Sequence, residues 1–350
     1  MNTSSAASRS REVRYVFDHV PDAGTAFEAA PGVYWLRMPL PFALDHINLW
    51  LLDDGDGWVI VDTGIASDVT RNAWRRLFGG IMAGKPVTRI ISTHFHPDHF
   101  GLAGWLTEKT GAPLLMTRTE WLTGSLLFGD VGGTVSREQV SLFRRHGLGR
   151  DRLDALEQRG NSYRRMLSVP PAHFVRIADG EQLRIGGRDW TVKVARGHAP
   201  EHACLYCADI GVLISGDQVL PRISPNVSLS AIEPAANPLA RFLESLDRLA
   251  ELPADTLVLP SHGLPFHGLR ERIDVLRAHH EERLWRLVSF CAAPHTAAET
   301  LDVLFPRVLD THQVMFAMGE SLSHLVFLYA AGRLQRQTGD DGIVRFRAPA

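Results

Sequence analysis

One order of segments occurs twice along this chain, and it restricts the fold more than any other feature of the sequence. The first copy reads GWVIVDTG, a helical stretch and TRIISTH, and the second reads GVLISGDQ, a helical stretch and TLVLPSH. Each copy predicts a strand, a helix and a second strand, and all four strands end at polar residues. Two such halves predict two stacked mixed sheets with helices outside, an α/β fold of the αβ/βα sandwich type. The alternative is a chance similarity between two ordinary α/β segments.

Apolar runs, turn residues and capping residues place the elements within each half. The first half is expected to contain strands at 33–38, 47–52, 58–64 and 88–93, and helices from Ser67 or Asp68 to about Leu77 and from about Pro97 to near Gly111. The second half is expected to contain strands at 183–185, 190–195, 203–207, 212–217 and 256–260, and a helix from Asn237 and Pro238 to about Leu252.

The length of 350 residues predicts about two domains. Residues 1–14, rich in Ser and Ala, are expected to form a flexible tail, and residues 15–268 hold both copies of the repeated order. Residues 121–175 interrupt the second half with helical patterns and no strand signal, so we expect a helical insertion or cap there. Residues 269–350 follow the order helix, helix, helix, hairpin, which is typical of a winged-helix module.

The insertion is rich in arginine. Between Arg137 and Arg165 there are eight arginines and four acidic residues. One interpretation is a solvated helical face. The other is a cap that attracts the anionic part of a substrate, and the candidates for that contact are Arg144, Arg145, Arg164 and Arg165.

Composition excludes several classes of protein. Hydrophobic residues make up 45% and charged residues 22%, which is typical of globular proteins and not of disordered, collagen-like or coiled-coil chains. The net charge of −2 argues against binding of polyanions through bulk charge. No uninterrupted apolar stretch approaches 18 residues, and the N-terminus lacks the apolar core of a signal peptide, so we expect neither a membrane span nor secretion. The three cysteines form no disulfide framework, which fits the cytoplasm.

The segment Thr93-His94-Phe95-His96-Pro97-Asp98-His99 carries the strongest chemical signal. In an extended chain His94 and His96 point to the same side, so both imidazoles can meet one metal ion. Pro97 then starts a helix and turns Asp98 and His99 toward a neighbouring point. Packing alone explains this cluster poorly, because each buried imidazole must satisfy two ring nitrogens.

Three further residues match this segment in kind and in place. His198 lies just past one expected strand, Asp217 ends another, and His262 follows a third. Strand ends in layered α/β folds deliver loop residues to a common crevice, so we expect all three to join the His94–His99 segment as ligands.

Together these residues resemble the metallo-β-lactamase superfamily, and the resemblance covers roughly residues 30–268. It implies an αβ/βα sandwich, a catalytic domain at 15–268 and a dinuclear metal site. The implied ligands are His94, His96 and His198 for one metal and Asp98, His99 and His262 for the other, with Asp217 bridging. Asp62, within Val61-Asp62-Thr63-Gly64, matches the first motif of the family and is implied to orient ligands without being one. His202 resembles the second histidine of the family's GHxxGH-type loop and is expected to support the ligands in the same way.

Imidazole and carboxylate ligands suit two divalent ions, and we expect Zn²⁺, with Fe and Mn as alternatives. Two such ions can hold a bridging water that attacks a carbonyl or phosphoryl centre, and Asp98 is expected to shuttle its proton beside the bridging Asp217. Asp217 stands where the best-known class B β-lactamases have a cysteine ligand, which disfavours antibiotic hydrolysis. His96 stands where diiron flavoprotein relatives usually have an acid, which disfavours redox chemistry. Persulfide dioxygenases share this scaffold, so their activity stays an alternative.

The C-terminal region resembles the winged-helix end of the lactamase-β-like-2 type hydrolases, which include endoribonucleases. From Thr296 to Ala350, however, there are five arginines, no lysine and six acidic residues. This region therefore has little net positive charge with which to bind the phosphates of a nucleic acid. The expected helix His312–Ala331 carries Glu320 and no Lys or Arg. Its apolar stripe suits packing on the main domain or on a second subunit, so a homodimer through the C-terminal helices is one expectation. The residues of the stripe are Val314, Met315, Met318, Leu322, Leu325 and Val326.

The sequence therefore favours a metal-dependent hydrolase of a small, anionic ester or thioester, of the acyl-CoA or glutathione-conjugate type. Nucleic acid is not expected as a partner. His267 is a further candidate for contact with the substrate. The alternatives are a single-strand endoribonuclease and a non-enzymatic binding module on a decayed hydrolase scaffold, and the complete ligand set speaks against the second of these.

Overall fold

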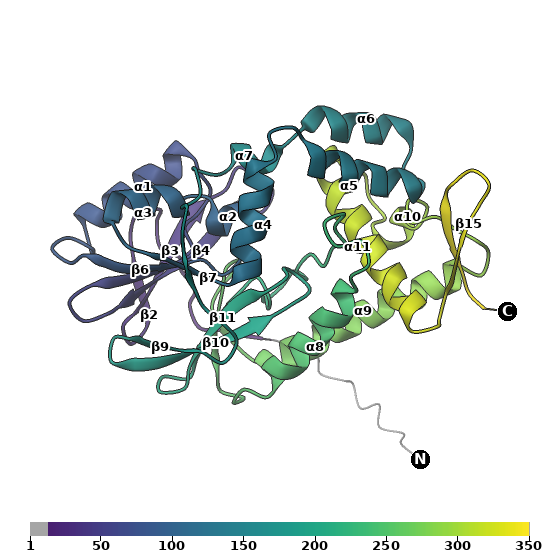
Figure 1. Ribbon diagram of the computed structural model, residues 1–350. Helices are drawn as coiled ribbons and strands as arrows, with labels where there is room; N and C mark the ends of the chain where they lie inside the picture. Colours follow the sequence, from purple (N-terminus) through teal and green to yellow (C-terminus); the bar gives the residue numbers. More distant parts are fainter. Residues whose placement is uncertain (1–12, 350) are drawn as a thin grey trace, which may run out of the picture.

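The computed structural model describes residues 13–349, and within them the two expected sheets face each other (Figure 1). Each sheet has seven strands. The first sheet has the order β2 (Phe27–Ala30), β3 (Val33–Pro39), β4 (His46–Asp53), β5 (Trp58–Val61), β6 (Val87–Ile91), β7 (Leu114–Met116) and β8 (Val175–Arg176). The second sheet has the order β1 (Arg14–Tyr15), β14 (Phe266–His267), β13 (Leu257–Pro260), β12 (Val212–Gly216), β11 (His202–Cys207), β10 (Arg188–Ala195) and β9 (Gln182–Ile185).

The strand pairing confirms the repeated order. In the first sheet β4 pairs antiparallel with β5, and β5 pairs parallel with β6 after the crossover helix α1 (Asp68–Gly79). In the second sheet β11, β12 and β13 pair in the same pattern, with α8 (Pro238–Ala250) as the crossover. Ser67 and Asn237 cap these two helices through side-chain oxygens that accept backbone N–H groups, as their positions in the sequence predict.

Alternation along the strands divides the core into layers. Trp35 and Trp50 point between the two sheets, whereas Leu36 and Leu49 point to the helices outside the first sheet. A third cluster lies outside the second sheet and is shared with the C-terminal helices. Two-sided burial explains why β5 and β12 are apolar at nearly every position.

The insertion and the C-terminal region lie side by side, and α6 contacts α11 (Figure 1). The insertion contains α4 (Arg118–Gly129), α5 (Thr134–Arg145), α6 (Arg150–Arg159) and α7 (Ser162–Arg165). The C-terminal region contains α9 (Leu269–Phe290), α10 (Leu301–Leu304), α11 (Thr311–Ala330) and the hairpin of β15 (Gln335–Thr338) and β16 (Val344–Arg347). The expected order of three helices and a hairpin is present.

The C-terminal helices have no core of their own. One buried cluster joins Leu213 and Val258 of the second sheet to α8, α9 and α11. Within the apolar stripe of α11, Met318 and Leu322 are fully buried in that cluster. The sequence left two surfaces on which this stripe could pack, the main domain and a second subunit. In the structure it packs on the main domain of the same chain.

Some expected boundaries are wrong. The helix expected from Pro97 to Gly111 is split into α2 (Pro97–Phe100) and α3 (Ala103–Thr110). The break occurs because Leu102 N–H donates to the carbonyl of Gly64 and Gly101 accepts from Ser168, so neither group is free to continue a helix. The insertion ends in a strand, β8, which pairs with β7.

The expected tail at residues 1–14 overlaps the first described strand. Residues 1–12 of it lie outside the described residues, and Arg14 belongs to β1, which pairs with β14. Within residues 13–349, no helix combines the length and the apolar character that crossing a membrane requires.

Candidate metal centre

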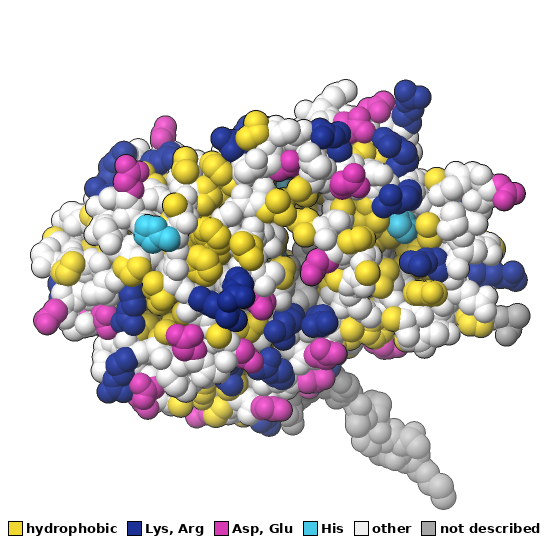
Figure 2. All heavy atoms as spheres, in the orientation of Figure 1, with side chains coloured by type: hydrophobic (Ala, Val, Ile, Leu, Met, Phe, Trp, Pro, Cys, Tyr) yellow, Lys and Arg dark blue, Asp and Glu magenta, His cyan; other side chains and the backbone are white. Residues whose placement is uncertain are grey.

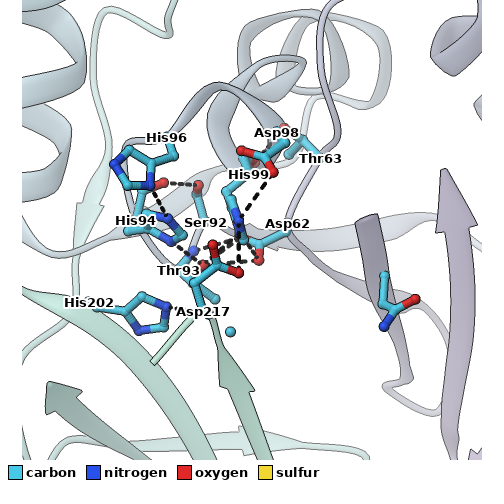
Figure 3. Close-up of polar contacts among 12 residues, drawn as sticks. Asp62, Thr63, Ser92, Thr93, His94, His96, Asp98, His99, His202 and Asp217 are labelled. Carbon is cyan, nitrogen blue, oxygen red and sulfur yellow. Dashed lines mark hydrogen bonds and ion pairs between the residues drawn. The ribbon is translucent and has the colours of Figure 1, made fainter. Parts of the chain in front are cut away.

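The candidate ligands lie at one edge of the sandwich because the strands before them end there. His94 follows β6, Asp217 follows β12 and His262 follows β13. The pairs β5–β6 and β12–β13 are parallel, so their carboxyl ends lie at the same edge of each sheet. Figure 3 shows side chains from both halves of the chain directed toward one space.

Three histidines and one carboxylate form the first group. His94 Nε2 lies 2.9 Å from His96 Nδ1 and 3.2 Å from His198 Nε2. His198 Nε2 also lies 3.4 Å from Asp217 Oδ2. Three imidazole nitrogens this close cannot all be satisfied by one another, since a neutral ring has one donor and one acceptor. A cation shared by their lone pairs would satisfy them, so the group fits a metal ion.

The second group contains Asp98, His99 and His262. His262 Nε2 lies 3.4 Å from Asp98 Oδ2 and 3.4 Å from Asp217 Oδ1. His99 Nε2 lies 3.5 Å from Asp217 Oδ1. One oxygen of Asp217 therefore faces the second group and the other faces the first, which is the position that a bridging ligand requires.

Two buried polar atoms in this space lack hydrogen bonds. Across residues 13–349, neither His99 Nε2 nor Asp217 Oδ1 has a hydrogen-bond partner, and the 3.5 Å between them is an ion-pair distance only. A buried polar atom without a partner costs about 1–3 kcal/mol, so such atoms are rare in folded proteins. Divalent ions would coordinate both atoms, and the donor set of nitrogens and carboxylate oxygens suits them.

The two groups also differ in protonation. Burial and the neighbouring His198 lower the pKa of His96 to about 3, and burial lowers the pKa of His94 well below its usual range. In the second group burial alone would lower the pKa of His262, but Asp217 and Asp98 raise it to about 10. Asp62, Asp217 and Asp98 likewise raise the pKa of His99 against its burial. The carboxylates thus favour positive charge at the second group.

Asp62 and Thr93 hold the histidines in place. Asp62 accepts hydrogen bonds from the Thr93 backbone N–H at 2.8 Å and from His99 Nδ1 at 2.7 Å. The Thr93 hydroxyl lies 3.0 Å from both Asp62 Oδ1 and His94 Nδ1 (Figure 3). Asp62 has φ of 64°, the left-handed region that Asp and Asn tolerate better than most residues. The backbone bends here so that its carboxylate can reach both partners.

His198 and His262 are each fixed by a partner on the ring nitrogen that faces away from the cluster. His198 Nδ1 donates to the Asn226 carbonyl and His262 Nδ1 donates to the His46 carbonyl, both at 2.8 Å. These bonds leave Nε2 of each ring facing the cluster. His202 is fully buried, and its Nε2 accepts the backbone N–H of Asp217 at 3.1 Å.

Sequence reasoning missed Glu120. This buried carboxylate, near the start of α4, accepts the backbone N–H of Phe95 at 3.0 Å and that of Glu201 at 2.5 Å. It therefore ties the His94–His99 segment to the loop that carries His198. Burial raises its pKa to about 8. No motif surrounds Glu120, and an acidic residue in the first turn of a helix is ordinary, so nothing in the sequence marks it.

Five predicted substrate contacts lie outside the cluster. His267 lies on β14, which pairs with β1, and it lines a cavity of about 650 Å³ near Gly211 and Leu257. This cavity is at the amino ends of β12 and β13, whereas the candidate ligands follow their carboxyl ends. Arg144 and Arg145 end α5, and Arg144 forms an exposed ion pair with Glu157. The other two, Arg164 and Arg165, lie on α7 beside Tyr163, whose hydroxyl donates to the Phe95 carbonyl in the ligand segment.

Comparisons with known proteins show the family and the fold of the chain. A family model described as the metallo-beta-lactamase superfamily matches residues 43–262, and one described as the metallo-beta-lactamase-like C-terminal domain matches residues 284–349. A solved beta-lactamase domain protein from Burkholderia ambifaria is 47% identical, with a TM-score of 0.90, over 97% of this chain and 99% of that chain. A metallo-beta-lactamase family protein from Thermus thermophilus is 33% identical, with a TM-score of 0.77, over 91% of this chain and 99% of that chain.

Relatives with named activities are more distant. The linear primary-alkylsulfatase of a Pseudomonas species is 27% identical over 65% of this chain, and the match spans 43% of that enzyme. A hydroxyacylglutathione hydrolase of Cereibacter sphaeroides is 30% identical over 50% of this chain and 48% of its own length. A human acyl-coenzyme A thioesterase is 24% identical over 74% of this chain and 83% of its own length. Because the superfamily model covers more than half of the sequence, the chain belongs to the metallo-beta-lactamase superfamily.

Proposed function

We propose that this protein is a metal-dependent hydrolase of a small ester or thioester. The observation that carries the proposal is the convergence of seven side chains, from segments as distant as residues 94 and 262, into two adjoining groups of metal-ligand type. A binding module on a decayed scaffold would have no need to retain all seven.

In this proposal His94, His96 and His198 would hold one divalent ion, and Asp98, His99 and His262 would hold the other. Asp217 would be shared between them, since one of its oxygens faces each group. Zn²⁺ is the proposed metal because imidazole and carboxylate ligands suit it, and Fe and Mn are alternatives. Two ions bound there would lower the pKa of a shared water toward about 7 and so supply hydroxide at neutral pH.

The protein's own groups then position the reaction and move its proton. Although burial alone would raise the pKa of Asp98, His99 and His262 lower it, so the carboxylate is ionised and able to accept a proton. Its oxygen lies beside the space between the two groups, which suits a proton shuttle. Asp62 and Thr93 keep the imidazoles oriented while charge develops.

The substrate class rests on two supports. Relatives named as a hydroxyacylglutathione hydrolase and an acyl-coenzyme A thioesterase act on thioesters, as their names state. In addition, α7 contacts the ligand segment through the Tyr163 hydroxyl, while its Arg164 and Arg165 donate to backbone carbonyls of the insertion itself. Because α7 contacts the ligand segment, we propose that this helix, rather than the end of α5, meets the anionic part of the substrate.

Two alternative activities, cleavage of RNA and of a sulfate ester, are included in the test. Against an endoribonuclease, α11, the third helix of the winged-helix-like region, buries Val314, Met318 and Leu325 in the chain's own core. On the face shown in Figure 2, Lys and Arg side chains are interspersed with Asp and Glu rather than gathered in one stripe. A sulfate ester is the other rival, because one relative is named an alkylsulfatase.

The experiment is a hydrolysis screen of thioesters, carboxylic esters, an alkyl sulfate and unstructured RNA, with added Zn²⁺, Mn²⁺ or Fe²⁺. We expect thioester or ester turnover in the wild-type protein and its loss in His96→Ala and Asp217→Ala, with circular dichroism unchanged. The exposed residue His173 offers a matched control, His173→Ala, which should retain full turnover. Near-native turnover in either cluster variant, or cleavage of RNA or alkyl sulfate alone, would overturn the proposal.

A further inference from the structure

The C-terminal region reaches one of the candidate ligands through a single loop. His198 Nδ1 donates to the carbonyl of Asn226, which lies in the segment between β12 and α8. This bond selects the tautomer of His198 that leaves Nε2 free to face His94 and Asp217. The position of the Asn226 carbonyl therefore decides where the His198 lone pair points.

One residue of the C-terminal helices, Glu320, contacts the side chain of Asn226, and a residue of the same loop, Ser228, contacts it as well. Asn226 Nδ2 lies 3.4 Å from Glu320 Oε2 of α11, and Asn226 Oδ1 accepts the Ser228 hydroxyl at 2.5 Å. Glu320 in turn forms an ion pair with Arg283 of α9, and the two side chains are 9% and 15% exposed. An ion pair this buried is a costly way to stabilise a fold, since both charges must leave water.

The backbone fixes the same loop to α11 independently. Leu229 N–H donates to the Gly319 carbonyl at 2.9 Å. A Cβ atom at Gly319 would lie 2.6 Å from the Ser228 hydroxyl, so only glycine lets the loop approach the helix this closely. The loop that orients His198 is thus fitted to the C-terminal helix by its backbone as well as by its side chains.

We propose that Glu320 and Arg283 are positioning residues for the metal centre, acting on His198 through Asn226. The proposal rests on the proposed function only in assigning His198 as a metal ligand. It gives the C-terminal region a role in the chemistry of the centre, although its sequence contributes no ligand. Removing the Glu320 carboxylate would free the Asn226 amide and let the imidazole of His198 rotate or change tautomer.

The expected effect is on metal affinity. Loss of a group that orients a ligand typically weakens metal binding by about tenfold to one-hundredfold. We expect Glu320→Gln to weaken Zn²⁺ binding by that factor at the ion held by His94, His96 and His198. The ion held by Asp98, His99 and His262 should be affected less. Asn226→Ala, which keeps the backbone carbonyl but loses the amide, should weaken the same step.

The test is a competition titration of the metal-free protein with Zn²⁺ and a chromophoric chelator, which resolves two binding steps. Wild type is compared with Glu320→Gln, Asn226→Ala and the double variant, and the two single effects should not add because they break one connection. The control is Glu282→Gln, which breaks the exposed ion pair with Arg286 on α9. Unchanged affinity in both single variants, or fully additive effects, would overturn the proposal.

A second measurement does not depend on metal. The ¹⁵N spectrum of the His198 imidazole in the metal-free protein should show the proton on Nδ1 in wild type and a mixture of tautomers in Glu320→Gln. A single, unchanged tautomer in that variant and in Asn226→Ala would refute the positioning role. If wild type bound no metal, the proposed function would fail, and the tautomer measurement would still decide this inference.

Discussion

Asp62→Asn is the sharpest test of how the second group of ligands is held. The Asp62 carboxylate accepts from both the Thr93 backbone N–H and His99 Nδ1, at 2.8 and 2.7 Å. An amide of the same shape has one acceptor oxygen, so one of these bonds must be lost. A hydrogen bond to a charged group contributes about 1.5–3 kcal/mol, which corresponds to roughly a tenfold to one-hundredfold change in an equilibrium constant. Asn also tolerates the left-handed backbone at this position, so the exchange adds little strain.

We therefore expect Asp62→Asn to weaken Zn²⁺ binding about tenfold to one-hundredfold, with the larger effect at the ion held by His99. Chelator competition on the metal-free protein measures both steps, and circular dichroism checks the fold. Asp68→Asn, at an exposed position on α1, is the control and should bind as wild type does. Wild-type affinity in a folded Asp62→Asn protein would show that Asp62 does not orient His99.

Two further predictions concern stability. Burial lowers the pKa of His280 to about 2 and that of His324 to about 3. Below pH 6.5 the unfolded chain binds protons that the folded one does not, so the free energy of unfolding should fall as pH falls from 6.5 toward 3. In urea unfolding, His324→Gln should lose about 1 kcal/mol less than wild type between pH 6 and 5, and equal losses would contradict the assignment. A Cβ at Gly104 of α3 would lie 1.7 Å from a backbone carbonyl of the insertion, so Gly104→Ala should cost about 1–3 kcal/mol. Gly129→Ala, where the space is open, should cost nothing, and equal unfolding midpoints would count against this contact.

Local signals predicted much of the fold. Apolar runs located β5, β6, β12 and β13, and the capping residues Ser67 and Asn237 marked the helices between them. The two-sheet arrangement followed because the same order occurs twice. These features depend on neighbours in sequence, so a single sequence is enough to find them.

Features set by distant contacts were not predictable. The break after α2 depends on backbone hydrogen bonds from Leu102 to Gly64 and from Ser168 to Gly101. The sequence around residue 101 does not indicate these bonds. At the site, the histidine-rich segment and the strand ends indicated the seven candidate ligands. Glu120 and Asn226 were not predicted. Glu120 binds backbone N–H groups far away in the chain, and Asn226 acts on the distant His198 through its backbone carbonyl, which every residue type has.

The hydrophobic cluster shared by the second sheet and helices α8 to α11 has a consequence for cooperativity. Removing everything after residue 268 would take away the side chains that α9 and α11 contribute to this cluster and would expose its apolar residues on α8 and the second sheet. We therefore expect such a fragment to associate with other copies rather than fold alone, and we expect the second half of the sandwich to unfold together with the C-terminal helices as a single unit.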